Sequence, residues 1–306
     1  FKDGDPKKGM ADHSRAGFFA TVHDRVTAGC TPDIREENYQ EYSTNFWEAI
    51  CGKTRLGANL EKPDYNGDGK ISYVEAHAHV IISSETIDIP VKTSDAFLRH
   101  YSKNARPKDA DSPPEAWVDP EQRYKDILKE ANPEDRAVLE ALSIKLKLKA
   151  EKLEQRSQEA RDLIKELEAQ RKKLAEQKKK PDTERNKIKA KLAGEIRKRW
   201  PEVSNPFHPN ARALLEPNQS KQVMALLNRG GAWGKYLKAK SDSAALEKKR
   251  FELDRRKVKC MRFVRVLENV VLEKNLEVAA DEKIVARYKK LRALENGTLS
   301  PNEPGA

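Results

Sequence analysis

The sequence predicts two regions of different class: an α/β domain over residues 1–102 and, further along, a long all-α coiled-coil hairpin. Near the N-terminus, short runs rich in β-branched and aromatic residues precede amphipathic segments, a pattern typical of strands followed by helices. Leucine then recurs every seven residues over a long stretch. Charge also divides the chain, because residues 1–100 hold 12 Lys and Arg against 16 Asp and Glu, whereas the remainder holds 48 against 33.

Composition excludes several classes of protein. Of 306 residues, 36% are charged and 37% hydrophobic, which is too polar for one compact globule and typical of long solvated helices. Cys30, Cys51 and Cys260 are too widely spaced to predict a disulfide framework or a C-x-x-C metal site. No run of 18 apolar residues occurs, so we expect no membrane span. The chain begins at Phe1 without a signal peptide, so we expect a truncated N-terminus, and the cytoplasm and a bacterial cell envelope both stay open.

The N-terminal elements follow from local patterns. Residues 17–22 and 25–30 are short apolar runs flanked by polar residues, which predicts two strands. Residues 42–52 predict a helix with Ser43 or Thr44 near its start and a glycine at its end. A second helix is expected to begin in the Asp- and Gly-rich stretch at 64–75 and to continue through the apolar residues that follow.

The remaining two thirds of the chain predict a hairpin. The seven-residue repeat runs through Leu139, Leu146, Leu153, Ala160, Leu167 and Leu174. A weaker repeat follows at residues 246–267, and prolines between the two forbid one continuous helix. We therefore predict a Pro-rich linker at 103–132, a coiled-coil helix at 133–200, a connector at 201–240, a returning helix at 241–296 and a tail at 297–306. The two helices are expected to pack antiparallel, and homodimerisation through the same stripe is the alternative geometry.

The stretch D-Y-N-G-D-G-K-I-S-Y-V-E at residues 64–75 has the pattern of an EF-hand calcium loop, which places oxygen ligands at positions 1, 3, 5, 7, 9 and 12. Gly69 allows the tight turn, and Ile71 is the expected apolar anchor. We predict one structural Ca²⁺ ion, because no second loop is present and Pro63 keeps an entering helix from abutting this one. A surface turn is the alternative. The predicted ligands are Asp64, Asn66, Asp68, the carbonyl oxygen of Lys70, Ser72 and Glu75.

Residues 17–80 resemble the C-terminal half of a caspase/legumain-like cysteine peptidase domain. The resemblance lies in A-T-V-H-D-R-V-T-A-G-C at 20–30, R-E-E-N-Y at 35–39 and E-Y-S-T-N-F-W-E-A-I at 41–50, followed by the Asp- and Gly-rich loop. It implies a partial α/β sandwich, a bacterial style of domain and, in the full-length protein, cleavage of a peptide or protein substrate by a thiolate. It also implies that Glu36 and Ser43 line the specificity pocket. Alternatively, Glu36 is a solvated loop acid and Ser43 a helix N-cap.

The catalytic dyad of that family is missing from the chain. The family uses a His before Gly and a Cys before a small residue and Gly, yet no His here precedes Gly, and the three cysteines have other neighbours. Cys30 is more simply a small buried apolar residue than a replacement nucleophile for pairing with His23. We therefore assign no catalytic residue, and we expect the chain to be an inactive part of a cysteine endopeptidase or not an enzyme.

The basic C-terminal region raises the question whether the partner is nucleic acid or protein. Clusters such as K-K-K-P and R-K-R-W could contact nucleic acid. However, Glu and Lys alternate through 151–178, which is typical of solvated coiled-coil flanks, and few aromatic residues are available to stack on bases. We expect a protein partner or self-association through the helices, and not nucleic acid. The alternative to the peptidase fragment is thus a noncatalytic, calcium-stabilised coiled-coil scaffold.

Overall fold

The computed structural model describes residues 15–28, 41–102 and 118–299. Of these residues 71% are helical. The strands that the described residues form are β1, Phe18–Phe19, and β2, Val91–Lys92, which pair antiparallel. The prediction of an α/β, caspase-like sandwich is therefore wrong.

The physical reason lies in how residues 15–28 are held. Only two residues of this segment pair with β2, and residues 25–28 lie outside any strand, whereas residues 29 and 30 lie outside the described part. Side chains replace the missing ladder: Ile89 N donates to Thr21 Oγ1 at 3.1 Å, and Ala28 N donates to Asp88 Oδ1 at 2.7 Å. An extended apolar run can thus be satisfied without a sheet, because side-chain oxygens accept hydrogen bonds as well as carbonyls do.

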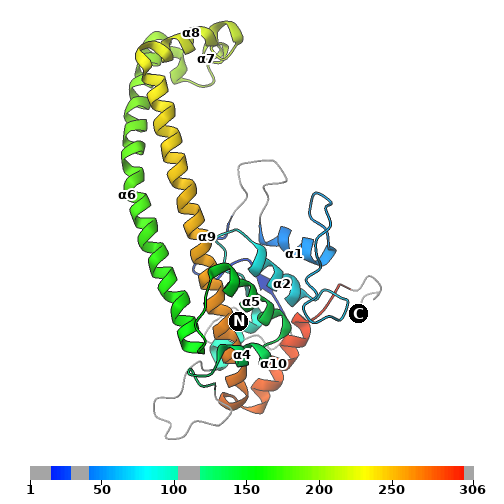
Figure 1. Ribbon diagram of the computed structural model, residues 1–306. Helices are drawn as coiled ribbons and strands as arrows, with labels where there is room; N and C mark the ends of the chain where they lie inside the picture. Colours follow the sequence, from blue (N-terminus) through cyan, green and yellow to red (C-terminus); the bar gives the residue numbers. More distant parts are fainter. Residues whose placement is uncertain (1–14, 29–40, 103–117, 300–306) are drawn as a thin grey trace. The chain divides into compact units, whose positions relative to one another are not determined.

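Two compact units make up the chain: unit 1 comprises residues 1–165 and 255–306, and unit 2 comprises residues 166–254. Two long helices contribute to both, α6 (Leu153–Arg199) and α9 (Ala232–Ala279). The shorter helices of unit 1 are α1 (Tyr42–Cys51), α2 (Tyr73–Ser83), α3 (Thr93–Tyr101), α4 (Tyr124–Glu130), α5 (Pro133–Leu146) and α10 (Glu282–Glu295) (Figure 1).

Helices α1 and α2 form one core of unit 1. Helix α1 closes at Gly52, whose φ of 66° is left-handed and therefore suits glycine. Ile71 packs with Phe46, Ala49, Ala76 and Val80, as expected of the apolar anchor of the loop at 64–75. This cluster fixes the end of the loop on both helices.

A second core joins α3, α9 and α10. Its buried members are Phe97, Leu98, Leu272, Leu276, Tyr288 and Leu291. Burying a leucine or phenylalanine side chain stabilises a fold by about 1.5–3 kcal/mol, so the C-terminal end of α9 belongs to this core and not to a coiled-coil seam.

The predicted helix at 133–200 is two helices. Helix α5 ends at Lys147, which is left-handed with a φ of 61°, and Leu148 N donates back to Ser143 O at 3.0 Å. Leu139 and Leu146 therefore lie in the core of unit 1, although the seven-residue repeat continues unbroken through them. The predicted returning helix is likewise divided into α9 and α10 by a new N-cap at Asp281. The predicted linker contains α4, and its residues 103–117 lie outside the described part.

Unit 2 is a helical hairpin, which is compatible with that part of the prediction (Figure 1). Arg171 on α6 and Asp254 on α9 form an ion pair at 2.8 Å, and Ser243 Oγ donates to Asp182 at 2.6 Å. The two helices are joined by the short elements η4 (Pro201–Ser204), α7 (Pro209–Ala213), α8 (Pro217–Asn228) and η5 (Arg229–Gly231).

Candidate functional site

Asp64 organises the loop at 64–75. Its Oδ1 accepts hydrogen bonds from the main-chain N–H groups of Gly67 (2.8 Å) and Asp68 (3.1 Å), and its Oδ2 accepts one from Gly69 (2.8 Å). Gly67 and Gly69 have φ values of 75° and 82°, a region that glycine enters without strain. One carboxylate therefore holds the tight turn together.

Asn66 and Asp68 lie beside Asp64. Asp68 N donates to Asn66 Oδ1 at 2.9 Å, and Asn66 Nδ2 donates to Asp68 Oδ2 at 3.1 Å. Lys70 N donates to Asp68 Oδ1 at 2.8 Å, which turns the chain at the predicted carbonyl ligand. The structure thus brings together the oxygen donors predicted for positions 1, 3 and 5.

Glu75 differs from the expected arrangement. Its side chain is buried, with Oε1 accepting from Tyr65 N (2.8 Å) and Asn66 N (3.2 Å), and Oε2 accepting from Ser72 N (2.9 Å) and Ser72 Oγ (2.7 Å). Ser72 and Glu75 also form the capping box of α2. The S-x-x-E spacing is the sequence signal for this cap, and sequence reasoning assigned both residues only to calcium.

The donor set therefore suits calcium, but one donor is engaged elsewhere. The six predicted ligands supply the oxygen atoms that calcium prefers. To bind the ion with both oxygens, Glu75 would have to turn away from the N–H groups of Tyr65 and Asn66. Within the described ranges, no three His, Cys, Asp or Glu side chains converge on one point as metal ligands in the present arrangement.

The end of the loop is tied to the C-terminal segment. Ser72 forms a β-bridge with Thr298, and Tyr73 N donates to Gly297 O at 2.9 Å. A Cβ atom at residue 297 would lie 3.1 Å from Leu294 O and 3.4 Å from the Tyr73 ring, so glycine permits this close approach. Residues predicted as a tail thus contact the start of α2.

Of the two residues predicted to line the specificity pocket, the structure describes only Ser43. Glu36 lies outside the described residues. Ser43 is exposed in the first turn of α1, and the N-cap of that helix is Glu41, so the N-cap interpretation of Ser43 is wrong. Ser43 borders an open depression of about 460 Å³ together with Trp47 and Cys51.

A buried cluster of charges joins α3, α5 and α10. Lys92 Nζ lies 2.9 Å from Asp95 and 3.8 Å from Asp135, and Arg292 pairs with Glu134 and with Glu295, the latter at 3.1 Å. Glu273 of α9 also lies 3.9 Å from Arg292, so five carboxyl groups meet two cations. Burial, the main cause, raises the pKa of Asp135 to about 7, with the neighbouring Glu134 adding to the rise. The cluster holds helices together and was not predicted, because its members are far apart in sequence.

Comparison of the chain with protein-family models, with curated proteins and with solved structures found no match. The peptidase resemblance therefore rests on its short sequence motifs alone. Among the described helices, none combines the length and the apolar character needed to cross a bilayer, which confirms for these residues that no helix spans a membrane.

Proposed function

We propose that the chain is a noncatalytic, calcium-stabilised interaction protein whose helical hairpin, unit 2, binds an acidic protein partner. One observation carries this proposal. Residues 166–254 hold 22 Lys and Arg against 12 Asp and Glu, so unit 2 has a net charge of +10 out of +11 for the whole chain. Such a concentration of positive charge attracts anionic partners and accelerates their encounter.

Exposed apolar side chains favour a protein as that partner. Phe207 is 92% exposed and Leu215 80% exposed, both in the segment that joins α6 to α9. Large apolar side chains within a charged surround are typical of protein interfaces. Trp233 and Tyr236 stack on each other with ring centroids 5.2 Å apart, which leaves each ring only one face for stacking on a nucleic acid base. The exposed ring of Phe207 suits either kind of partner, and the nuclease treatment described next separates the two.

The experiment is a partner capture followed by a measured affinity. The full chain is immobilised and exposed to a nuclease-treated extract, and any retained protein is identified, purified and titrated by biolayer interferometry. Affinity is expected to fall as salt rises. Changing Phe207 and Leu215 together to Ser should weaken binding by about tenfold or more. Phe251→Ser is the control, because Phe251 is an exposed apolar residue of unit 2 (53%) that lies outside the connecting segment.

Two results would contradict this proposal. Capture only of nuclease-sensitive material would show a nucleic-acid binder. Concentration-dependent dimerisation in sedimentation, abolished by the Phe207 and Leu215 changes, would show that a second copy of the chain occupies this surface instead.

In this proposal the loop at 64–75 binds one Ca²⁺ ion, which fixes the loop to α2 and to residues 297–299. The support is the gathered set of Asp64, Asn66 and Asp68 described above. Calcium binding is measured by calorimetry and by thermal unfolding of the full chain. Calcium at 100 times its dissociation constant should stabilise the chain by about 2.7 kcal/mol.

Asp64→Asn should abolish this stabilisation, because it removes a charged ligand. Asp281→Asn is the control, since Asp281 also accepts a main-chain hydrogen bond, from Ile284 N at 3.0 Å, but caps α10 away from the loop. An equal calcium effect in the wild type and in Asp64→Asn, or no effect in either, would refute the calcium proposal.

The peptidase interpretation stays a prediction from the sequence. Incubation of the chain with a quenched fluorescent protein substrate is expected to give no cleavage. Cleavage that is lost after alkylation of the cysteines would contradict the noncatalytic proposal and support the peptidase family.

A further inference from the structure

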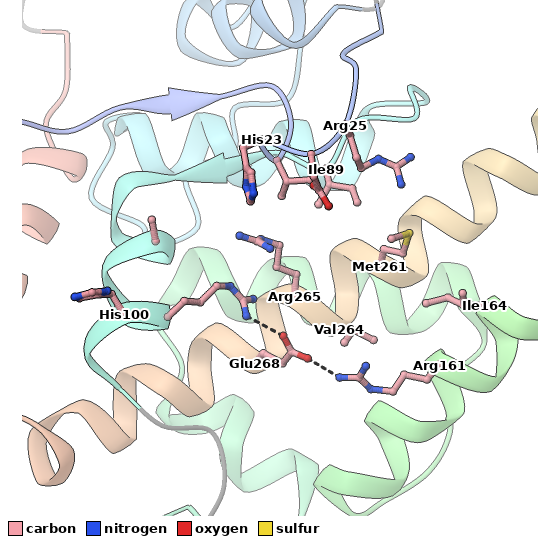
Figure 2. Close-up of a pocket in the computed structure, with 14 residues that line it drawn as sticks. His23, Arg25, Ile89, His100, Arg161, Ile164, Met261, Val264, Arg265 and Glu268 are labelled. Carbon is pink, nitrogen blue, oxygen red and sulfur yellow. Dashed lines mark hydrogen bonds and ion pairs between the residues drawn. The ribbon is translucent and has the colours of Figure 1, made fainter. Parts of the chain in front are cut away.

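A cavity of about 920 Å³ lies in unit 1, between the turn at residues 22–25 and helices α3, α6 and α9. Figure 2 shows its lining side chains, with His23 and Arg265 projecting into it from opposite walls. Neither the calcium loop nor the hairpin surface contributes to it, so what it does is independent of the proposed function.

Positive charge predominates in this cavity. Among the described residues, its lining includes four arginines but only two acidic residues, Asp24 and Glu268. His23 and His100 also line the cavity. Glu268 is shared by two of these arginines: it pairs with Arg99 at 3.1 Å and with Arg161 (Figure 2). Arg25 donates to the carbonyl of Ile87 at 3.4 Å. Three of the four arginines therefore have partners within the protein.

Arg265 is the exception. Its Nε is buried without a hydrogen-bond partner, and no hydrogen bond or ion pair joins its side chain to another described residue. Burial, the main cause, and the nearby charge of Arg99 lower the pKa of this guanidinium. The carboxylates of Asp95, Glu268 and Asp24 offset only part of this lowering of the pKa. A buried donor without an acceptor is costly, and a guanidinium matches a carboxylate or phosphate with two parallel hydrogen bonds. An anion beside Arg265 would satisfy the donor and offset the excess of positive charge.

The other walls are apolar. Ile89, Ala96, Ile164, Met261 and Val264 line the cavity beside the arginines. A cavity of this volume is within the range of small-molecule sites, which combine apolar walls with a few oriented polar groups. Inorganic phosphate would occupy only a small part of it, whereas an anion with an apolar body would use both kinds of wall.

We propose that this cavity binds a small organic anion, whose carboxylate or phosphate group pairs with Arg265 and whose apolar body lies against Ile164, Met261 and Val264. Arg99 and Arg161 remain paired with Glu268 and contribute positive potential at the site. Binding satisfies the buried Nε, so a bound anion also stabilises the fold.

The test is calorimetric titration of the full chain with decanoate and decyl phosphate below their critical micelle concentrations, with decanol below its solubility limit, and with acetate and inorganic phosphate. At least one of the two long-chain anions should bind, and decanol should bind about tenfold more weakly or worse, because it lacks the charge. Acetate and inorganic phosphate should bind more weakly than the matching long-chain anion. Comparing decanoate with decyl phosphate identifies the preferred head group.

Arg265→Gln should weaken binding of the preferred anion by about tenfold or more. Arg287→Gln is the matched control, because Arg287 is an exposed arginine of α10 outside the cavity and should leave the affinity unchanged. If Arg265→Gln fails to fold, the comparison of anion with decanol on the wild type still decides whether charge is required. Equal affinity for anion and decanol, unchanged affinity in Arg265→Gln, or no binding of either long-chain anion would overturn the proposal.

Discussion

Arg262 offers the sharpest test of how unit 1 is held together. Its side chain on α9 is 1% exposed. It donates to one main-chain carbonyl in the last turn of α2 and to three in the segment that follows α2. Nε donates to Asp88 O at 2.8 Å, Nη1 to Ser84 O at 2.8 Å and Ile81 O at 3.1 Å, and Nη2 to Thr86 O at 3.1 Å. One guanidinium thus serves as the hydrogen-bond partner of a segment that forms no regular structure there.

The expected cost of Arg262→Met follows from these contacts. Methionine keeps an apolar stem but removes every donor, and four hydrogen bonds to a charged group at about 1.5–2 kcal/mol each amount to about 6–8 kcal/mol. Part of this loss is offset because a charge no longer has to be buried. Burial lowers the pKa of Arg262 to about 10, a shift that corresponds to about 3 kcal/mol. The net loss of stability is therefore about 3–5 kcal/mol, the range for removing one partner from a buried charged network.

Urea unfolding at neutral pH, followed by circular dichroism, measures this loss. Arg287→Met is the control, because Arg287 is exposed on α10 and should change the free energy of unfolding by no more than about 0.5 kcal/mol. Amide hydrogen exchange should also show faster exchange in residues 84–91 of the Arg262 variant. A loss below about 1 kcal/mol in Arg262→Met would refute the argument that this guanidinium holds the segment.

Three further substitutions test the buried groups of unit 1. The folded chain binds a proton at Asp135 more tightly than the unfolded chain does, so the wild type loses stability as pH rises from about 4 to about 7. In urea unfolding, the stability of the wild type relative to Asp135→Asn should therefore fall between pH 4 and pH 8, and a constant difference would contradict this. The opposite sign holds for His77, since burial lowers its pKa to about 3 and its contribution is lost as pH falls below about 6.5; the stability advantage of the wild type over His77→Gln should shrink between pH 7 and pH 4, and a constant difference would contradict this. Leu142→Ala should cost about 2–5 kcal/mol because Leu142 is fully buried, whereas Ile144→Ala on the exposed face of the same helix should cost about 0.5 kcal/mol or less in the same assay.

Features that depend on neighbouring residues were predictable. Helix α1 closes at Gly52 as expected, and the loop residues Asp64, Asn66 and Asp68 lie together because their hydrogen bonds reach only two to five residues along the chain. A glycine that ends a helix in the left-handed conformation, and an Asp that accepts hydrogen bonds from nearby main-chain N–H groups, both interact only with residues a few positions away in the sequence. The pattern of residues is enough to specify such local structure.

The predicted strands failed for the opposite reason. A strand needs a partner, and the partner of Phe18 and Phe19 is a two-residue segment more than 70 residues away. Composition at 17–30 indicates only an extended, partly apolar segment. It does not show whether a sheet, or side chains such as Thr21 and Asp88, will satisfy the backbone.

The residues around the cavity could not be predicted from the sequence either, because the cavity forms only where distant segments meet. Arg25, Arg99, Arg161 and Arg265 are ordinary charged residues of a basic sequence, and each alone is expected to be solvated. Segments far apart in the chain meet around them and bury the Nε atom of Arg265, while Arg99 and Arg161 share one carboxylate. The amino-acid sequence specifies where the charges and the local turns are, because these depend on residue type and near neighbours. Which charges become buried, paired or left without a partner depends on which distant segments pack together, and therefore on the fold.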